Sequence, residues 1–230
     1  MMPSFRKGWL ACSLLVGGLG WSQVPDSAAR LRLARHAALF RLGSADSSSS
    51  LEYLEAHSSG PIELSITRIN DYMSFDPPHS AADDLAQLVK SCDVVAVGTT
   101  TRQDSALNFE HTFVYSDWQI DVTRVLKNAS SVPVRAGSAV TAVRAGGSLT
   151  VDGRLVTAHD STIPDLTLNH TYVLFMEALP ETSSMRSGIA FDVTGKFPVF
   201  IDDPRNPTSL RQFERSPVAD FLTALERSLQ

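Results

Sequence analysis

The 230-residue sequence contains little cysteine, only Cys12 and Cys92. Cys12 falls in an N-terminal stretch with the features of a signal peptide, so the mature chain keeps Cys92 alone and cannot form an internal disulfide. A domain of this length can bury a core large enough to fold without cross-links. Cys92 lies between the end of an expected helix and a valine-rich strand. We therefore expect it to be a small buried hydrophobe rather than a reactive thiol.

Extended basic tracts are also missing. The formal charge is -5, the isoelectric point is about 5.6, and charged residues make up 20% of the chain against 43% hydrophobic residues. This composition is typical of a globular protein. A nucleic-acid partner is not expected, because such proteins present a basic face. An acidic balance likewise disfavours electrostatic docking on anionic membranes.

A long hydrophobic run is absent as well. The apolar stretch Gly8 to Leu19 has about a dozen residues, too few to span a bilayer. It follows Arg6 and Lys7 and precedes the small-residue site Gly20-Trp21-Ser22. This order predicts a signal peptide over residues 1–22 and Gln23 as the new N-terminus. We expect an exported protein (periplasmic, envelope-associated or secreted) with no transmembrane segment in the mature chain. Lipidation at Cys12 is not expected, because almost no apolar stretch precedes it.

Local catalytic and metal-binding motifs are missing too. None of the six histidines has a partner at i+2 or i+4, so no local zinc motif exists; they are His36, His57, His79, His111, His159 and His170. No Gly-x-Ser-x-Gly elbow occurs. The run His159-Asp160-Ser161 contains triad residue types, but neighbours in sequence cannot form the relay. We therefore predict no catalytic residue, no metal site and no cofactor.

Residues 23–59 are predicted to be a helical leader followed by a linker, loosely attached to the rest. Ala28 to Leu42 is rich in helix-forming residues and ends at Gly43. Its apolar residues at helical spacing are Leu31, Ala34, Ala38 and Leu42, and its arginines take other positions. Ser44 to Ser50 is typical of a flexible linker.

Residues 60–200 are predicted to be the folded β domain. Ser80 and Asp83 form a capping box before a short helix. A long strand follows, with Val114, Ser116, Trp118, Ile120 and Val122 on one face and Tyr115, Asp117, Gln119 and Asp121 on the other. The phase slips at the adjacent apolar residues Val125 and Leu126, which predicts a β-bulge.

Further strands complete the domain. Asp152-Gly153 is the favoured two-residue turn of a hairpin. Tyr172 to Met176 is apolar on both faces, which predicts a central strand. In the last region, residues 201–230, Ser216 and Pro217 begin an amphipathic helix expected to pack on the barrel or to cap one end of it. Several short strands without βαβ alternation indicate a sandwich or a barrel, and a long bent strand favours the barrel.

The order of these segments resembles the netrin-like (NTR) domain found in tissue inhibitors of metalloproteinases and in bacterial secreted proteins. The residues that carry the resemblance are Cys92-Asp93-Val94-Val95-Ala96-Val97-Gly98, the strand Trp118 to Lys127, Gly146-Gly147 and Tyr172-Val173-Leu174-Phe175. It covers about Asp83 to Gly195. The resemblance implies a mostly-β fold with flanking helices, built on a five-stranded, closed OB-like barrel.

The resemblance also implies that the barrel binds something outside the cytoplasm. The inhibitors place an N-terminal cysteine on the metal of a protease, but here the expected N-terminus is Gln23, so protease inhibition does not carry over. We predict a non-enzymatic module that binds a protein or a glycan through Tyr115, Asp117 and Gln119. The alternative for Tyr115 is packing under the N-terminal segment or a loop. The alternative function is a secreted hydrolase whose site is assembled from scattered His, Asp and Ser residues.

Overall fold

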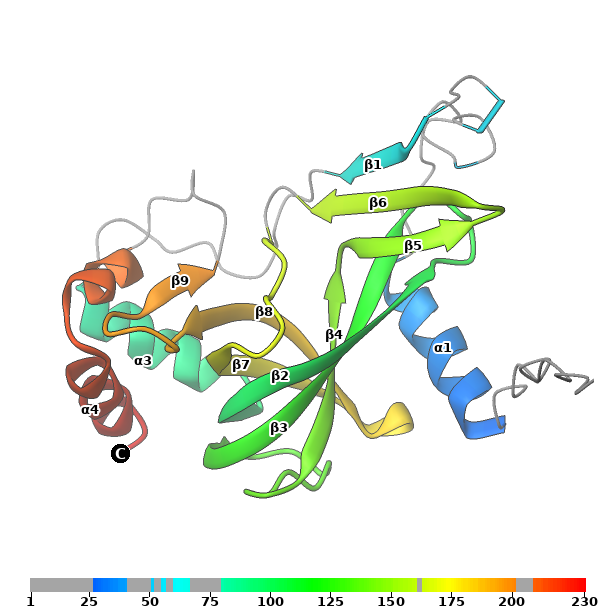
Figure 1. Cartoon of the computed structure of the whole chain (residues 1–230). Coiled ribbons are helices and arrows are strands. Elements are labelled where there is room, and N and C mark those ends of the chain that lie inside the picture. The colour runs from blue at the N-terminus through cyan, green and yellow to red at the C-terminus, as the bar shows by residue number, and fades with distance from the viewer. Residues whose placement is uncertain are drawn as a thin grey trace, which may run out of the picture.

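The computed structural model describes residues 27–40, 51, 55–56, 60–66, 80–160, 163–201 and 209–230 (Figure 1). The expected signal peptide, the serine-rich stretch and residues 202–208 lie outside these residues. Within them the chain is mostly β with flanking helices, as the sequence predicts. The strands are β1 Ile62–Ile66, β2 Val94–Leu107, β3 Val114–Asn128, β4 Ala139–Ala145, β5 Gly147–Val151, β6 Arg154–Asp160, β7 Thr171–Leu179, β8 Ser184–Asp192 and β9 Val199–Ile201. The helices are α1 Ser27–Leu39, α3 Ala81–Ser91 and α4 Val218–Ser228, with short 3-10 turns η2 Pro180–Thr182 and η3 Ser209–Arg215.

The larger sheet has the strand order β4-β3-β2-β7-β8-β9. Neighbours in this order are antiparallel. An additional parallel pairing joins β4 to β8, with Ala142 opposite Met185 and Val143 opposite Arg186. This pairing links the two ends of the five-strand run β4-β3-β2-β7-β8 into a ring. Strand β7 lies between β2 and β8, which confirms the central position predicted from its apolar residues.

The predicted bulge is present in β3. Lys127 pairs with Val95 and Val125 pairs with Ala96, which leaves Leu126 as the extra residue. The register shifts again between Val97 and Gly98, and between Thr100 and Arg102. Bulges increase the local twist and bend a strand. The long strands β2 and β3 are visibly bent (Figure 1).

The strands of the ring share one buried apolar cluster. Along β2 and β7, alternate residues point into it, as the two-residue period of a strand requires. The cluster includes Val94 and Ala96 of β2, Trp118 and Ile120 of β3, Val140 and Ala142 of β4, Tyr172 and Leu174 of β7, and Met185 and Ala190 of β8. The ring is therefore filled by side chains from all of its five strands.

Helices α3 and α4 cover the other face of β2, β7 and β8. Phe221 of α4 packs on Phe191 of β8, with ring centroids 4.5 Å apart. The capping box predicted at the start of α3 is confirmed, because the Ser80 hydroxyl accepts from the Asp83 amide and the Asp83 carboxylate accepts from the Ser80 amide. Helix α4 has Pro217 as its N-cap, one residue later than the predicted cap at Ser216.

A smaller sheet, β1-β6-β5, extends from one end of the larger one (Figure 1). The turn between β5 and β6 is the predicted Asp152-Gly153, and both residues have positive φ, 47° and 81°. Gly146 lies between β4 and β5 and Gly147 begins β5, and both again have positive φ. A Cβ on Gly147 would lie 2.1 Å from the Ser116 hydroxyl, so only glycine allows this close approach.

Cys92 gives a test of this packing. The cysteine is free and buried at the C-terminal end of α3, and burial raises the pKa of its thiol from 9.0 to about 11 against the opposing effect of the Lys127 ammonium. We expect the folded protein to react with iodoacetamide about a hundredfold more slowly than a small peptide thiol at about pH 8. The folded state holds the thiol proton more tightly than the unfolded chain does. The free energy of unfolding therefore falls as the pH rises from 9.0 to about 11. Alkylation rates measured by mass spectrometry check the prediction, and equal rates for protein and peptide would contradict it.

Candidate functional site

The three residues predicted to bind a ligand lie on the face of β3 that is turned toward α1. Tyr115 is 1% exposed, stacks on Phe40 with ring centroids 5.4 Å apart, and donates its hydroxyl hydrogen to the Leu33 carbonyl at 3.0 Å. Burial raises the pKa of the Tyr115 phenol, and the Asp117 charge raises it further. Tyr115 is therefore not exposed to a ligand, and the alternative of packing under the N-terminal segment is correct for this residue.

Helix α1 uses a different face from the one predicted. Leu31 of the expected apolar stripe is 52% exposed, whereas His36, Ala37 and Phe40 are buried. The predicted apolar stripe was based on helical spacing alone. The buried face is instead the one that matches Tyr115 and Asp117 on β3, which only the fold places beneath the helix. The helix is thus docked on the sheet and not loosely attached.

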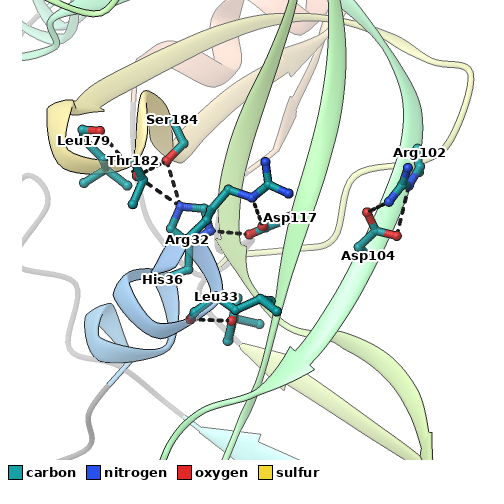
Figure 2. A network of polar contacts seen from close by, with 10 residues as sticks. Arg32, Leu33, His36, Arg102, Asp104, Asp117, Leu179, Thr182 and Ser184 are labelled. Carbon is teal, nitrogen blue, oxygen red and sulfur yellow. Dashed lines mark hydrogen bonds and ion pairs between the residues drawn. The ribbon is translucent and has the colours of Figure 1, made fainter. Parts of the chain in front are cut away.

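His36 is the centre of this docking (Figure 2). Its Nδ1 lies 2.7 Å from the Asp117 Oδ1 and its Nε2 lies 2.7 Å from the Ser184 hydroxyl. A carboxylate can only accept, so Nδ1 donates to Asp117, and Nε2 is hydrogen-bonded to the Ser184 hydroxyl. Thr182 lies 3.3 Å from the same nitrogen and is hydrogen-bonded to Ser184. One imidazole therefore connects α1 with β3 and with the start of β8.

The order Asp117–His36–Ser184 has the connectivity of a serine-hydrolase triad. Its exposure is different from that of an active site, because His36 and Ser184 are each 0% exposed. A nucleophile must be reachable by the carbonyl carbon that it attacks. The relay in this conformation satisfies buried polar groups and holds the helix on the sheet.

Next to α1, the same face of the sheet carries a small polar groove of about 80 Å³. Its lining comes from four elements: Arg32 of α1, Arg102 and Asp104 of β2, Asp117 and Gln119 of β3, and Thr141 of β4. Arg32 lies 3.8 Å from Asp117, and Arg102 donates from Nε to Asp104 at 3.0 Å (Figure 2). Two of the predicted residues, Asp117 and Gln119, thus meet in one groove, and Tyr115 lies outside it.

The other described histidines are dispersed. His170 Nδ1 lies 2.6 Å from Asp192 Oδ2. Burial alone would raise the pKa of the Asp192 carboxyl, but hydrogen bonds from His170 and Thr194 outweigh burial and lower it.

His159 is 3.9 Å from Asp165, and His111 lies in the exposed loop between β2 and β3. Among the described residues, no group of three His, Cys, Asp or Glu side chains could hold a metal ion. His57 and His79 lie outside the described residues.

The sequence did not predict a role in the site for Arg32, His36, Thr182 or Ser184. One signal was available, because Arg32 and His36 are four residues apart and must share a face of the helix. Nothing in the sequence indicated that this face would meet Asp117, 81 positions further along the chain.

Comparison with known proteins does not assign the chain to a family. No protein-family model matches it, and no curated protein matches it significantly. Among the described residues, no helix is both long and apolar enough to cross a bilayer. The proposed function therefore rests on the geometry of the site.

The His36 contact predicts a specific loss of stability. We expect His36→Ala to lower the free energy of unfolding by about 2–4 kcal/mol, because it leaves Asp117 and Ser184 buried without their ring partner. The variant should also expose α1 to trypsin after Arg32 and Arg35. Urea unfolding and timed proteolysis measure the two effects.

His159→Ala is the matched control, since this histidine is largely exposed. It should change the free energy of unfolding by no more than about 0.5 kcal/mol. Equal unfolding midpoints and equal cleavage rates for the two variants would show that His36 does not hold the helix.

Proposed function

We propose that the chain is an exported, non-enzymatic binding module on a five-stranded, NTR/OB-like barrel. It binds an extracytoplasmic protein or glycan through the face of β3 and β4 beside α1. The strand ring supports the barrel, because the OB fold is a five-stranded Greek-key arrangement. In the ring β4-β3-β2-β7-β8, the pairing of β4 with β8 is parallel and all the other pairings are antiparallel.

The position of the polar groove supports the binding face. OB folds bind ligands on the surface of their second and third strands, between the loops that follow the first and the fourth strands. Counted along the ring sequence, β3 and β4 are the second and third strands. The corresponding loops are the β2–β3 loop and the η2 connection between β7 and β8. Helix α1 covers part of this face, and the groove with Gln119 and Thr141 lies beside it.

The single observation that carries the proposal is a contrast in exposure. The residues with acid–base connectivity, His36 and Ser184, are fully enclosed, whereas Arg32, Arg102 and Asp104 of the groove are about half exposed or more. Exposed charges of both signs can recognise a partner without performing chemistry on it.

The groove favours a protein over a glycan. Sugar recognition commonly uses an aromatic side chain as a stacking surface. The residues that line the groove are charged or polar, and Tyr115 is covered by α1. Paired arginine and aspartate side chains are suited to the charged side chains of a protein partner.

A capture experiment tests this proposal. The mature chain, purified with its native N-terminus and tested against the envelope fraction of its own cell, should retain a partner. We expect Arg102→Ala and Gln119→Ala to weaken that interaction by about fivefold to thirtyfold each. Arg227→Ala on α4 is the matched control and should have no effect. N-terminal sequencing of the native protein should begin at Gln23.

Two results would contradict the proposal. Retention that is identical for the Arg102, Gln119 and Arg227 variants would remove the groove from the binding surface. A native protein that keeps Met1 and fractionates with the cytosol would remove export.

The second candidate is a hydrolase that uses Ser184 as nucleophile. The relay Asp117–His36–Ser184, with both bonds at 2.7 Å, favours it. Such an enzyme would form a covalent adduct at Ser184 with a fluorophosphonate probe, and the adduct would be lost in His36→Ala. Because Ser184 is enclosed, we expect no labelling of the folded protein. A stoichiometric adduct at Ser184 would establish the hydrolase and overturn the binding module.

A further inference from the structure

A second hollow, distinct from the polar groove, lies on the other side of α1. It is a cavity of about 310 Å³ between the last turns of α1 and the η2 connection. None of the residues that line it lines the polar groove. Its volume falls at the lower end of the range of about 300–1,000 Å³ for small-molecule sites. A ligand of this cavity must therefore be small.

Four of the eight residues that line the cavity are apolar. Ala38 and Leu39 come from α1, and Leu179 and Pro180 come from the end of β7 and the start of η2. An aliphatic group placed between these side chains leaves water without losing a hydrogen bond. The walls are therefore suited to a short hydrocarbon side chain.

Two of the polar lining residues belong to the hydrogen-bonded relay. His36 contributes to the lining, and its ring is fixed by Asp117 on one nitrogen and by Ser184 on the other. Thr182 also lines the cavity and bonds to the same relay. Since both ring nitrogens are already hydrogen-bonded, the ring has no further hydrogen bond to offer a ligand.

The charges of the cavity lie at its rim and have opposite signs. Arg35 of α1 and Glu181 of η2 both line it, and Arg35 Nε lies 3.0 Å from Glu181 Oε2. The two side chains are 57% and 67% exposed. An exposed ion pair contributes little to stability, so either ion can exchange its partner for a ligand group at small cost.

We propose that this cavity binds a free α-amino acid with an aliphatic side chain. The ligand carboxylate accepts hydrogen bonds from the Arg35 guanidinium, whose planar donors match a carboxylate. The ligand ammonium donates to the Glu181 carboxylate. The side chain enters between Leu39 and Leu179. An α-amino acid carries its two charges one carbon apart, which suits a cation and an anion that already touch. Binding thus replaces one exposed ion pair with two.

A titration with L-leucine tests the proposal on the wild-type mature chain. We expect binding with a dissociation constant of about 1 mM or tighter, measured by calorimetry and by NMR shifts of Leu39 and Thr182. Two analogues lack one charge each: 4-methylpentanoate has no ammonium and 3-methylbutylamine has no carboxylate. Each should bind at least about fivefold more weakly than leucine.

Variants locate the site. Arg35→Ala and Glu181→Gln should each weaken leucine binding by about fivefold or more. Arg30→Ala is the matched control, because this exposed arginine is also on α1 but does not line the cavity. The groove variant Arg102→Ala should leave leucine binding unchanged, and Arg35→Ala should leave the protein partner bound. Failure of one site is therefore distinguishable from failure of the other.

Three results would overturn the proposal. The first is the absence of any leucine signal up to about 10 mM. The second is equal affinity for leucine and for either analogue, which would exclude recognition of both charges. The third is an affinity that is the same in the Arg35, Glu181 and Arg30 variants. The analogue series uses the unchanged protein, so it decides the question even where a variant fails to fold.

Discussion

One buried imidazole organises the surface of this protein on the side of α1. His36 reaches Asp117 of β3 and Ser184 of β8, each at 2.7 Å, with no exposure of its own. A buried carboxylate or hydroxyl without a partner is costly, so the three groups favour only conformations in which they meet. The covering of Tyr115, the polar groove and the apolar cavity all require that α1 be docked in this way.

The same relay shows why connectivity alone does not define an active site. Asp117, His36 and Ser184 have the order and the distances of a triad, yet a carbonyl substrate has no access to a serine that is fully enclosed. The exposure of His36 and Ser184 distinguishes a structural relay from an active site. The enclosure favours a structural role for the relay, and the proposed function places recognition on the half-exposed charges around it.

Helix α1 contributes an arginine to each of two hollows. Arg32 lines the polar groove on β2, β3 and β4, and Arg35 lines the apolar cavity beside η2. In each hollow the arginine faces a carboxylate, Asp117 in one and Glu181 in the other. The apolar walls are found only beside Arg35. The proposed ligands differ for this reason: charged protein side chains in the groove, and an aliphatic amino acid in the cavity.

The sequence by itself determined the local structure. Alternating apolar residues predicted the strands, adjacent Val125 and Leu126 predicted the bulge, and the Ser80–Asp83 capping box and the Asp152-Gly153 turn predicted their elements. Each of these signals acts between near neighbours in the chain. Only the tertiary structure decided which face α1 buries and which groups His36 meets, because these contacts join residues 81 and 148 positions apart. Helical spacing favoured Leu31 for the buried side. The surface that receives the helix, however, is built from β3 and β8. Its shape and polarity exist only once both strands have taken their places in the sheet.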